Sequence, residues 1–182
     1  CVSPHNLSNL PAGPHILKVR ARDRAQNLSI EYAYSWTVDL TVPSVTLTQG
    51  PMPFTSTSTA QIAFTGVNAA SFECQQDNGS YASCVSPQAP SGLTEGSHVF
   101  RIRAKAASGV VGSPTEVKWT VDLTAPAVPM LSTNAATLSK VKSASVSFAS
   151  TDSASGVASY ECSQNNTTFA TCVSPINLTN LA

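Results

Sequence analysis

The sequence repeats itself, and this repeat constrains the fold more than any other feature of the chain. The phrase Cys-Val-Ser-Pro begins at Cys1, at Cys84 and again at Cys172. The first two copies stay aligned without a gap for more than forty residues, and residues 36–41 recur letter for letter at 119–124. Self-similarity of this kind is typical of chains built from structural units in tandem. We therefore interpret the chain as a series of repeats.

The repeat boundaries are indicated by a shared phrase that ends in proline. Val-Asp-Leu-Thr-x-Pro occupies residues 38–43 and 121–126. Because proline cannot donate to a sheet ladder, Pro43 and Pro126 are predicted to end one repeat and open the next. The predicted domains are the C-terminal half of a repeat at 1–40, a complete repeat at 41–123 and the N-terminal part of a further repeat at 124–182.

Apolar and polar residues alternate along the segments that precede these boundaries. A period of two with aromatic and β-branched residues predicts strands that cover a core with one face. Further strands are expected near 45–48, 61–64, 71–76 and 146–148, and no stretch has helical periodicity. Short strands separated by turn residues predict an all-β chain of tandem immunoglobulin-like antiparallel β-sandwich repeats. The side chains expected to face inward are Leu17, Val19, Ala21, Tyr34, Trp36 and Val38, with Phe100, Ile102, Ala104, Val117, Trp119 and Val121 in the second copy.

Four cysteines form two pairs with the same spacing of ten residues, Cys74 with Cys84 and Cys162 with Cys172. Asn-Gly at residues 78–79 is a hairpin turn signal, because both residue types tolerate positive φ. Folding the chain about this turn places the first two cysteines opposite each other, about 4.5–5.5 Å apart, which is close to disulfide geometry. Zinc is the alternative use, but this spacing without a nearby histidine or second cysteine pair fits a zinc site poorly. We predict one disulfide in each pair.

Cys1 is the odd cysteine of the five. In the other two copies a cysteine precedes the Cys-Val-Ser-Pro phrase by ten residues. The partner of Cys1 is therefore expected upstream of the given residues. Disulfides persist in oxidising compartments, so we expect an extracellular or cell-surface location.

Composition excludes several classes of protein. With 42% hydrophobic and 11% charged residues, the chain does not have the composition of a disordered one. No apolar run approaches the ~20 residues that span a bilayer, so membrane insertion is not expected. A formal net charge of zero argues against binding nucleic acid. The sequence has no Gly-x-Ser-x-Gly, His-Glu-x-x-His or phosphate-loop motif, and we expect no enzymatic activity.

Three phrases resemble the bacterial Ig-like tandem repeats of large surface adhesins and other exported fibrous proteins. They are Phe-Glu-Cys followed by Cys-Val-Ser-Pro, then Gly-Ser-His-Val-Phe-Arg-Ile-Arg-Ala, then Trp-Thr-Val-Asp-Leu-Thr-Ala-Pro. The resemblance covers essentially the whole chain and implies seven-stranded-type sandwiches, secretion and a stalk or adhesive role. Many such repeats carry Ala-x-Asp-x-Ala-Gly-Asn before the last strand; residues 21–27 approximate it, and residues 104–108 do not.

Two aspartates, Asp39 and Asp122, recur at the repeat boundaries, where repeats of this kind sometimes hold Ca²⁺. Calcium prefers six to eight oxygen ligands, and one carboxylate with scattered hydroxyls supplies few of them. The alternative is that both are solvated turn residues, and the same alternative applies to Asp152 in the turn-rich insertion at 151–156. No other cofactor or metal is expected.

A basic stripe occupies matching outward positions on one strand of each repeat. It could bind an anionic polysaccharide or a cell envelope. The alternative is a solvated strand face that discourages edge aggregation and pairs with Glu73 and Glu161. The stripe consists of Lys18, Arg20, Arg22, Arg101, Arg103 and Lys105.

His15 and His98 are interpreted as structural residues.

The preferred functional hypothesis is a structural stalk or spacer of a bacterial cell-surface or extracellular fibre or adhesin, stabilised by the hairpin disulfides. Its expected partners are neighbouring repeats of the same protein and, in a filament, copies of itself. Two alternatives stay open: a carbohydrate- or host-surface-binding module, and an accessory array of a secreted enzyme. We expect the incomplete repeats to be part of a longer chain; the alternative is that they exchange strands with neighbouring chains.

Overall fold

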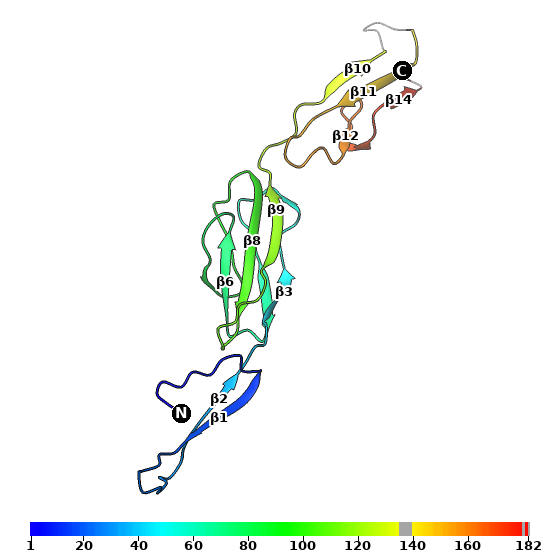
Figure 1. The fold of residues 1–182 in the computed structure, drawn as a ribbon. Helices are drawn as coiled ribbons and strands as arrows, with labels where there is room; N and C mark the ends of the chain where they lie inside the picture. Colours follow the sequence, from blue (N-terminus) through cyan, green and yellow to red (C-terminus); the bar gives the residue numbers. More distant parts are fainter. Residues whose placement is uncertain (135–139, 180, 182) are drawn as a thin grey trace. The chain divides into compact units, whose positions relative to one another are not determined.

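A computed structural model describes residues 1–134, 140–179 and 181. Over these residues the chain forms strands and no helix (Figure 1). Antiparallel sheets predominate, which is consistent with a β-sandwich, and the prediction of an all-β chain is confirmed. The described residues therefore include no helix that could span a membrane.

The chain divides into two compact units. The first comprises residues 1–50, 62–88 and 100–117, and the second comprises residues 51–61, 89–99 and 118–182.

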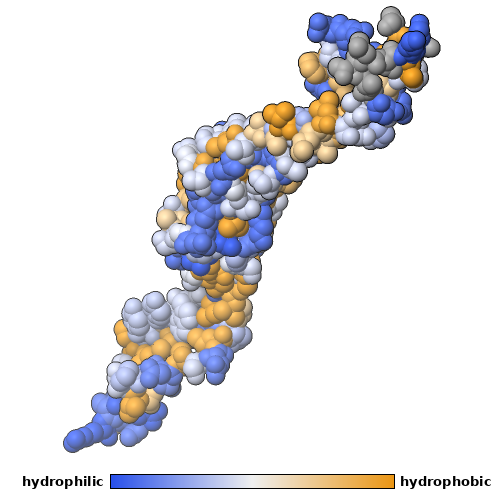
Figure 2. Space-filling model, turned by 90° about the horizontal axis from the view of Figure 1, so that it is seen from above, coloured by the Kyte–Doolittle hydropathy of each residue, from blue (hydrophilic) through white to orange (hydrophobic). Residues whose placement is uncertain are grey.

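The first strands form a hairpin. β1 (Gly13–Val19) pairs antiparallel with β2 (Tyr32–Val38), and His15 lies opposite Trp36 with their rings stacked at 5.6 Å. Val19 and Tyr34, expected to face a core, are 47% and 60% exposed. That expectation is wrong for them in this structure, because the hairpin has no further strand paired to it among the described residues. Figure 2 shows hydrophobic residues, drawn in orange, on the surface of the molecule.

Residues 41–123 contribute two sheets. β3 (Ser44–Gln49) pairs antiparallel with β5 (Ala63–Val67). The larger sheet has five strands in the order β4 (Phe54–Thr55), β9 (Thr115–Val121), β8 (Gly96–Lys105), β6 (Ser71–Gln76) and β7 (Ala82–Cys84).

The two-residue strand β4 departs from the antiparallel prediction, because it pairs in parallel with β9. The Thr120 N–H donates to the carbonyl of Pro53 at 2.8 Å, and the Asp122 N–H donates to that of Thr55 at 2.9 Å. Because proline has no backbone N–H, Pro53 can bond to the neighbouring strand only through its carbonyl.

The hydrophobic core lies on the alternating face predicted for β8 and β9. Ile102 on β8 and Val121 on β9 have no exposed surface. Ile62, next to β5, is also fully buried. The apolar side chains on this face of β8 and β9 are therefore buried, because a second layer of strands packs against them. The other predicted inward residues of these strands, Phe100, Ala104, Val117 and Trp119, are buried as well.

The last segment has two small antiparallel sheets. β11 (Ser143–Ala149) lies between β10 (Met130–Thr133) and β14 (Ile176–Thr179). β12 (Tyr160–Cys162) pairs with β13 (Ala170–Cys172).

Equivalent residues of the sequence repeat make the same local contacts. The Phe64 N–H donates to the Ser86 hydroxyl at 2.8 Å, and the Phe148 N–H donates to the Ser174 hydroxyl at 2.8 Å. The ring of Phe64 meets that of Phe72 edge-on at 5.1 Å, and Phe148 meets Tyr160 in the same way at 5.0 Å. Each serine belongs to a Cys-Val-Ser-Pro phrase, so the repeated phrase has a repeated packing role.

Truncation of the core should reveal which strand residues stabilise the fold. We expect Ile102→Ala to lower the free energy of unfolding by about 2–5 kcal/mol, because it removes a fully buried side chain and leaves a cavity. Urea unfolding followed by tryptophan fluorescence measures the change. Ile16→Ala is the matched control, since Ile16 is 58% exposed on β1. Equal losses for the two variants would contradict the assignment of the core.

Candidate functional site

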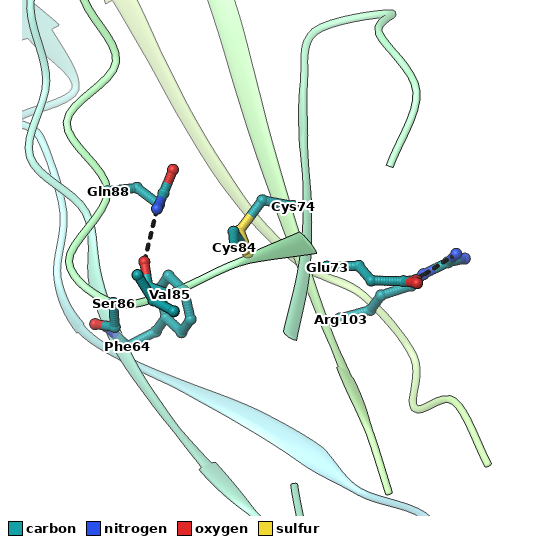
Figure 3. The surroundings of a disulfide bond; sticks show 8 residues. All are labelled: Phe64, Glu73, Cys74, Cys84, Val85, Ser86, Gln88 and Arg103. Atoms are coloured by element: carbon teal, nitrogen blue, oxygen red, sulfur yellow. Dashed lines mark hydrogen bonds and ion pairs between the residues drawn. A yellow bond between two sulfur atoms is a disulfide. The ribbon is translucent and has the colours of Figure 1, made fainter. Parts of the chain in front are cut away.

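The structure contains both predicted disulfides. Cys74 on β6 is bonded to Cys84 at the end of β7, with 5.7 Å between their Cα atoms (Figure 3). Cys162 and Cys172 are bonded across β12 and β13 with 5.8 Å between their Cα atoms. Cys1 is free and exposed, and its pairing with an upstream cysteine stays a prediction.

The two cysteines do not lie directly opposite each other, which corrects the predicted register. Cys74 pairs with Ala82, and Cys84 pairs with Phe72, so the disulfide runs diagonally between the strands. The turn closes earlier than an Asn-Gly turn would: the Gly79 N–H donates to the Gln76 carbonyl at 2.9 Å. Its centre is therefore residues 77–78, and the strand register shifts with it.

Asparagines replace glycine in the second hairpin turn. Asn165 and Asn166 have φ angles of 51° and 59°, and the Thr167 N–H donates to the Gln164 carbonyl at 3.1 Å. Two successive residues with positive φ suit a tight hairpin turn, and asparagine tolerates this conformation better than most residues. The turn thus keeps the cysteine spacing without glycine.

An ion pair flanks the first disulfide on the other face of β6. Glu73 and Cys74 are adjacent, so their side chains point to opposite faces of the strand, as Figure 3 shows. Arg103 lies opposite Glu73 in the β6–β8 register and donates from Nε to Glu73 Oε2 at 2.7 Å. Its guanidinium also lies 3.9 Å from the centre of the Tyr81 ring. Planar contacts of this kind favour arginine over lysine.

Three of the six residues of the basic stripe, Lys18, Arg101 and Arg103, form ion pairs within the chain. Arg101 Nε donates to Glu116 Oε1 at 2.7 Å, and Lys18 Nζ donates to Glu31 Oε1 at 2.7 Å. The expected pairing with Glu73 is confirmed through Arg103, whereas the structure shows no ion pair for Glu161 among the described residues. Binding of a polysaccharide or envelope by the stripe stays a prediction.

Acceptor groups of the boundary aspartates are engaged by neighbouring residues. Asp39 Oδ1 accepts the Thr41 N–H at 2.9 Å, and hydrogen bonds from the side chain and backbone of Thr41 lower the pKa of Asp39. A hydrogen bond from the Ser155 side chain, together with those from Thr124, holds the pKa of Asp122 below its ordinary value. Both carboxylates are thus stabilised in the charged form.

The turn aspartate Asp152 organises its own loop. Its Oδ1 accepts the N–H groups of Ala154, Ser155 and Gly156 at 3.0, 2.9 and 3.1 Å. Asp122 and Asp152 line one shallow cavity of about 230 Å³. In the described part of the chain, no group of three or more His, Cys, Asp or Glu side chains is placed to hold a metal ion. Calcium binding at the boundaries stays a prediction.

The histidines interpreted as structural make equivalent contacts. His98 Nε2 donates to the Thr94 carbonyl at 2.8 Å, and its ring lies 5.7 Å from that of Trp119. His15 Nε2 donates in the same way to the Pro11 carbonyl at 2.8 Å. Each histidine therefore fixes the turn before its strand.

Sequence reasoning missed the role of Asp23. Its Oδ1 accepts the Asn27 N–H at 2.9 Å and its Oδ2 accepts the Asn27 side-chain amide at 3.0 Å, which closes the loop after β1. The phrase at residues 21–27 is the signal that could have indicated it. The hydroxyl roles of Ser86 and Ser174 were missed as well, although both serines lie within the repeated Cys-Val-Ser-Pro phrase.

Neither a protein-family model nor a curated protein sequence matches the chain. The geometry of the chain itself is therefore the basis for assigning its function.

Each disulfide should stabilise the fold by restricting the unfolded chain. We expect the Cys74→Ala, Cys84→Ala double variant to lose about 2–3 kcal/mol of unfolding free energy, because the bond closes a loop with a sequence separation of 10. Urea unfolding under non-reducing conditions provides the measurement. Cys1→Ser is the control and should leave the midpoint unchanged, since Cys1 is free and exposed. An unchanged midpoint in the double variant would show that the bond does not contribute.

Acid should weaken the fold partly through Asp122. Its folded-state pKa lies below the value of about 3.9 in unfolded chains, so the unfolded state binds the proton more tightly. The resulting stability is complete above about pH 5 and is lost as the pH falls through the folded-state pKa. The urea midpoint should therefore fall less steeply with acidification in Asp122→Asn than in the unaltered protein. Parallel pH profiles would exclude a contribution from this carboxylate.

Proposed function

We propose that this chain is a structural segment made of tandem immunoglobulin-like repeats, acting as a stalk or spacer of a bacterial extracellular or cell-surface fibre or adhesin. The observation that carries the proposal is the hairpin disulfide, which recurs with a sequence separation of 10 in two segments of the chain. A spacer needs units that stay folded outside the cell, and a local covalent bond in each unit serves that need.

The packing around each disulfide supports the same role. The serine that follows Cys84 by two residues holds the backbone of Phe64, and Ser174 holds Phe148 in the same way. Each disulfide hairpin is thereby tied to a strand of another sheet. The features that recur between segments are those that fix the fold, as expected of a load-resisting unit.

The charged side chains support a spacer better than a ligand-binding module. Lys18, Arg101 and Arg103 each form an ion pair at 2.7 Å with a glutamate of the same chain. A ligand anion would have to displace these partners. Asp152, for its part, accepts backbone N–H groups of its own loop, which is a role in turn structure.

Stretching single molecules tests the mechanical part of the proposal. When the central segment unfolds under force, the intact disulfide should keep the residues between Cys74 and Cys84 from extending. Reduction should then add about 30 Å of contour length per disulfide, as expected for a sequence separation of 10. The Cys74→Ala, Cys84→Ala variant is the control, because its central segment should show the longer extension without reductant.

Two results would count against the proposal. Free thiols at Cys74 and Cys84 in protein taken from its native source would remove the extracellular assignment. Unfolding of the central segment at forces no higher than those that extend an unstructured chain would remove the mechanical one.

A further inference from the structure

The tips of the two disulfide hairpins share one short motif although most of their residues differ. Residues 77–80 read Asp-Asn-Gly-Ser, and the equivalent residues 165–168 read Asn-Asn-Thr-Thr. Only the second residue is identical, and the fourth carries a hydroxyl in both tips. Each tip therefore keeps Asn-x-Ser/Thr with x other than proline, which is the acceptor motif for glycans attached to asparagine.

The amide and the hydroxyl of this motif are exposed and unengaged in both tips. Asn78 and Ser80 are exposed, and so are Asn166 and Thr168. None of these four side chains makes a hydrogen bond within the part of the chain that the structure describes. The first motif lies within residues 41–123, where both sheets of the core are present. Its exposure is therefore a property of the folded repeat.

The turn of the first hairpin does not depend on the Asn78 side chain. The turn is closed by the Gly79 N–H, which donates to the Gln76 carbonyl at 2.9 Å. The positive φ in this turn, 50°, belongs to Asp77 and not to Asn78. Asn166 has a positive φ of 59°, so the backbone also favours asparagine in the second tip. The first tip has no such backbone reason for its asparagine.

Other copies of the motif have groups that the fold already uses. The Asn27 side-chain amide donates to Asp23 Oδ2 at 3.0 Å, and the Ser29 hydroxyl donates to the Ile30 carbonyl at 2.8 Å. Asn177 lies within β14, which pairs with β11. None of the other copies is kept in the central repeat. The copies that begin at Asn6, Asn27, Asn165 and Asn177 have Ala89, Val110, Asp77 and again Ala89 as their equivalents.

We propose that Asn78 and Asn166 are acceptor sites for N-linked glycans, so that each disulfide hairpin carries a carbohydrate at its tip. Exposed loop tips are preferred sites of proteolytic cleavage, and a glycan there covers the backbone. This inference rests on the extracellular location in the proposed function and adds a modification to it.

The transfer needs an activated sugar, either a nucleotide-linked or a lipid-linked diphosphate donor, and an enzyme of the producing cell. The side-chain amide nitrogen forms a bond to the anomeric carbon of the sugar. The bond from that carbon to the diphosphate oxygen breaks, and the diphosphate leaves with the electron pair. The amide nitrogen gives up one proton, so atoms and charge balance without any change in oxidation state.

Mass spectrometry of protein recovered from its native source tests the proposal. Cleavage after glutamate yields the peptide 74–95, which contains Asn78 and both cysteines of the first disulfide. One species therefore reports the sugar and the disulfide together. We expect a carbohydrate mass on this peptide and on the peptide that begins at Cys162. Fragmentation that keeps the sugar on its residue should assign it to Asn78 and Asn166.

Variants produced in the same source locate the acceptor. Asn78→Gln and Ser80→Ala should each abolish the carbohydrate on peptide 74–95, because each removes one part of the motif. Ser80→Thr should retain it, since threonine keeps the hydroxyl. Asn27→Gln is the matched control and should leave the carbohydrate content unchanged, because the Asn27 amide is engaged by Asp23.

Unmodified Asn78 and Asn166 would overturn the proposal. A sugar that stays on the peptide in Asn78→Gln would overturn it too, because a hydroxyl would then be the acceptor. Equal modification of Asn27 would contradict selection by exposure of the tips. An unmodified peptide that retains its disulfide would leave the spacer proposal standing, whereas a glycosylated peptide with free thiols would count against the spacer proposal alone.

Discussion

The antiparallel pairing of β6 with β8 is the interaction on which the rest of the structure depends. It places Cys74 opposite the fully buried Ile102 on the core face, and Glu73 opposite Arg103 on the outer face. The disulfide then joins β7 to this pair, and the Arg103 guanidinium lies over Tyr81 from the same hairpin. One register therefore sets the covalent bond, the ion pair and the core together, and a shift by one residue would exchange the two faces.

Much of this fold follows from the periodicity of apolar residues. The exceptions lie in segments of only two residues, which are too short to show a period. The alternation along β8 and β9 predicts their buried faces, and the bounds of β6 match the predicted strand at 71–76. The two-residue strand β4 has no room for a period, and its partner is decided by which edge of the sheet is free. The turn at residues 77–78 closes earlier than the Asn-Gly pair indicates, and that small change moves the whole β7 register.

The candidate site was predictable where the spacing is local and not where partners come from distant elements. Two cysteines separated by 10 residues across a turn can be paired from the sequence. The Ser155 side chain that lowers the pKa of Asp122 cannot be identified in this way, because it lies in the turn-rich insertion at 151–156, far from Asp122 in the sequence. The same holds for Glu116, whose partnership with Arg101 depends on β9 lying beside β8.

An amphipathic strand pattern specifies which face needs cover and does not specify what covers it. Val19 and Ile102 occupy equivalent positions in nearly the same pattern, yet one is half exposed and the other fully buried. The difference lies in the neighbouring strand: β8 has β6 beside it, whereas β1 has only β2 among the described residues. Because the sequence of β1 is repeated in β8, the central segment shows which contacts such a strand makes when its partner strand is present.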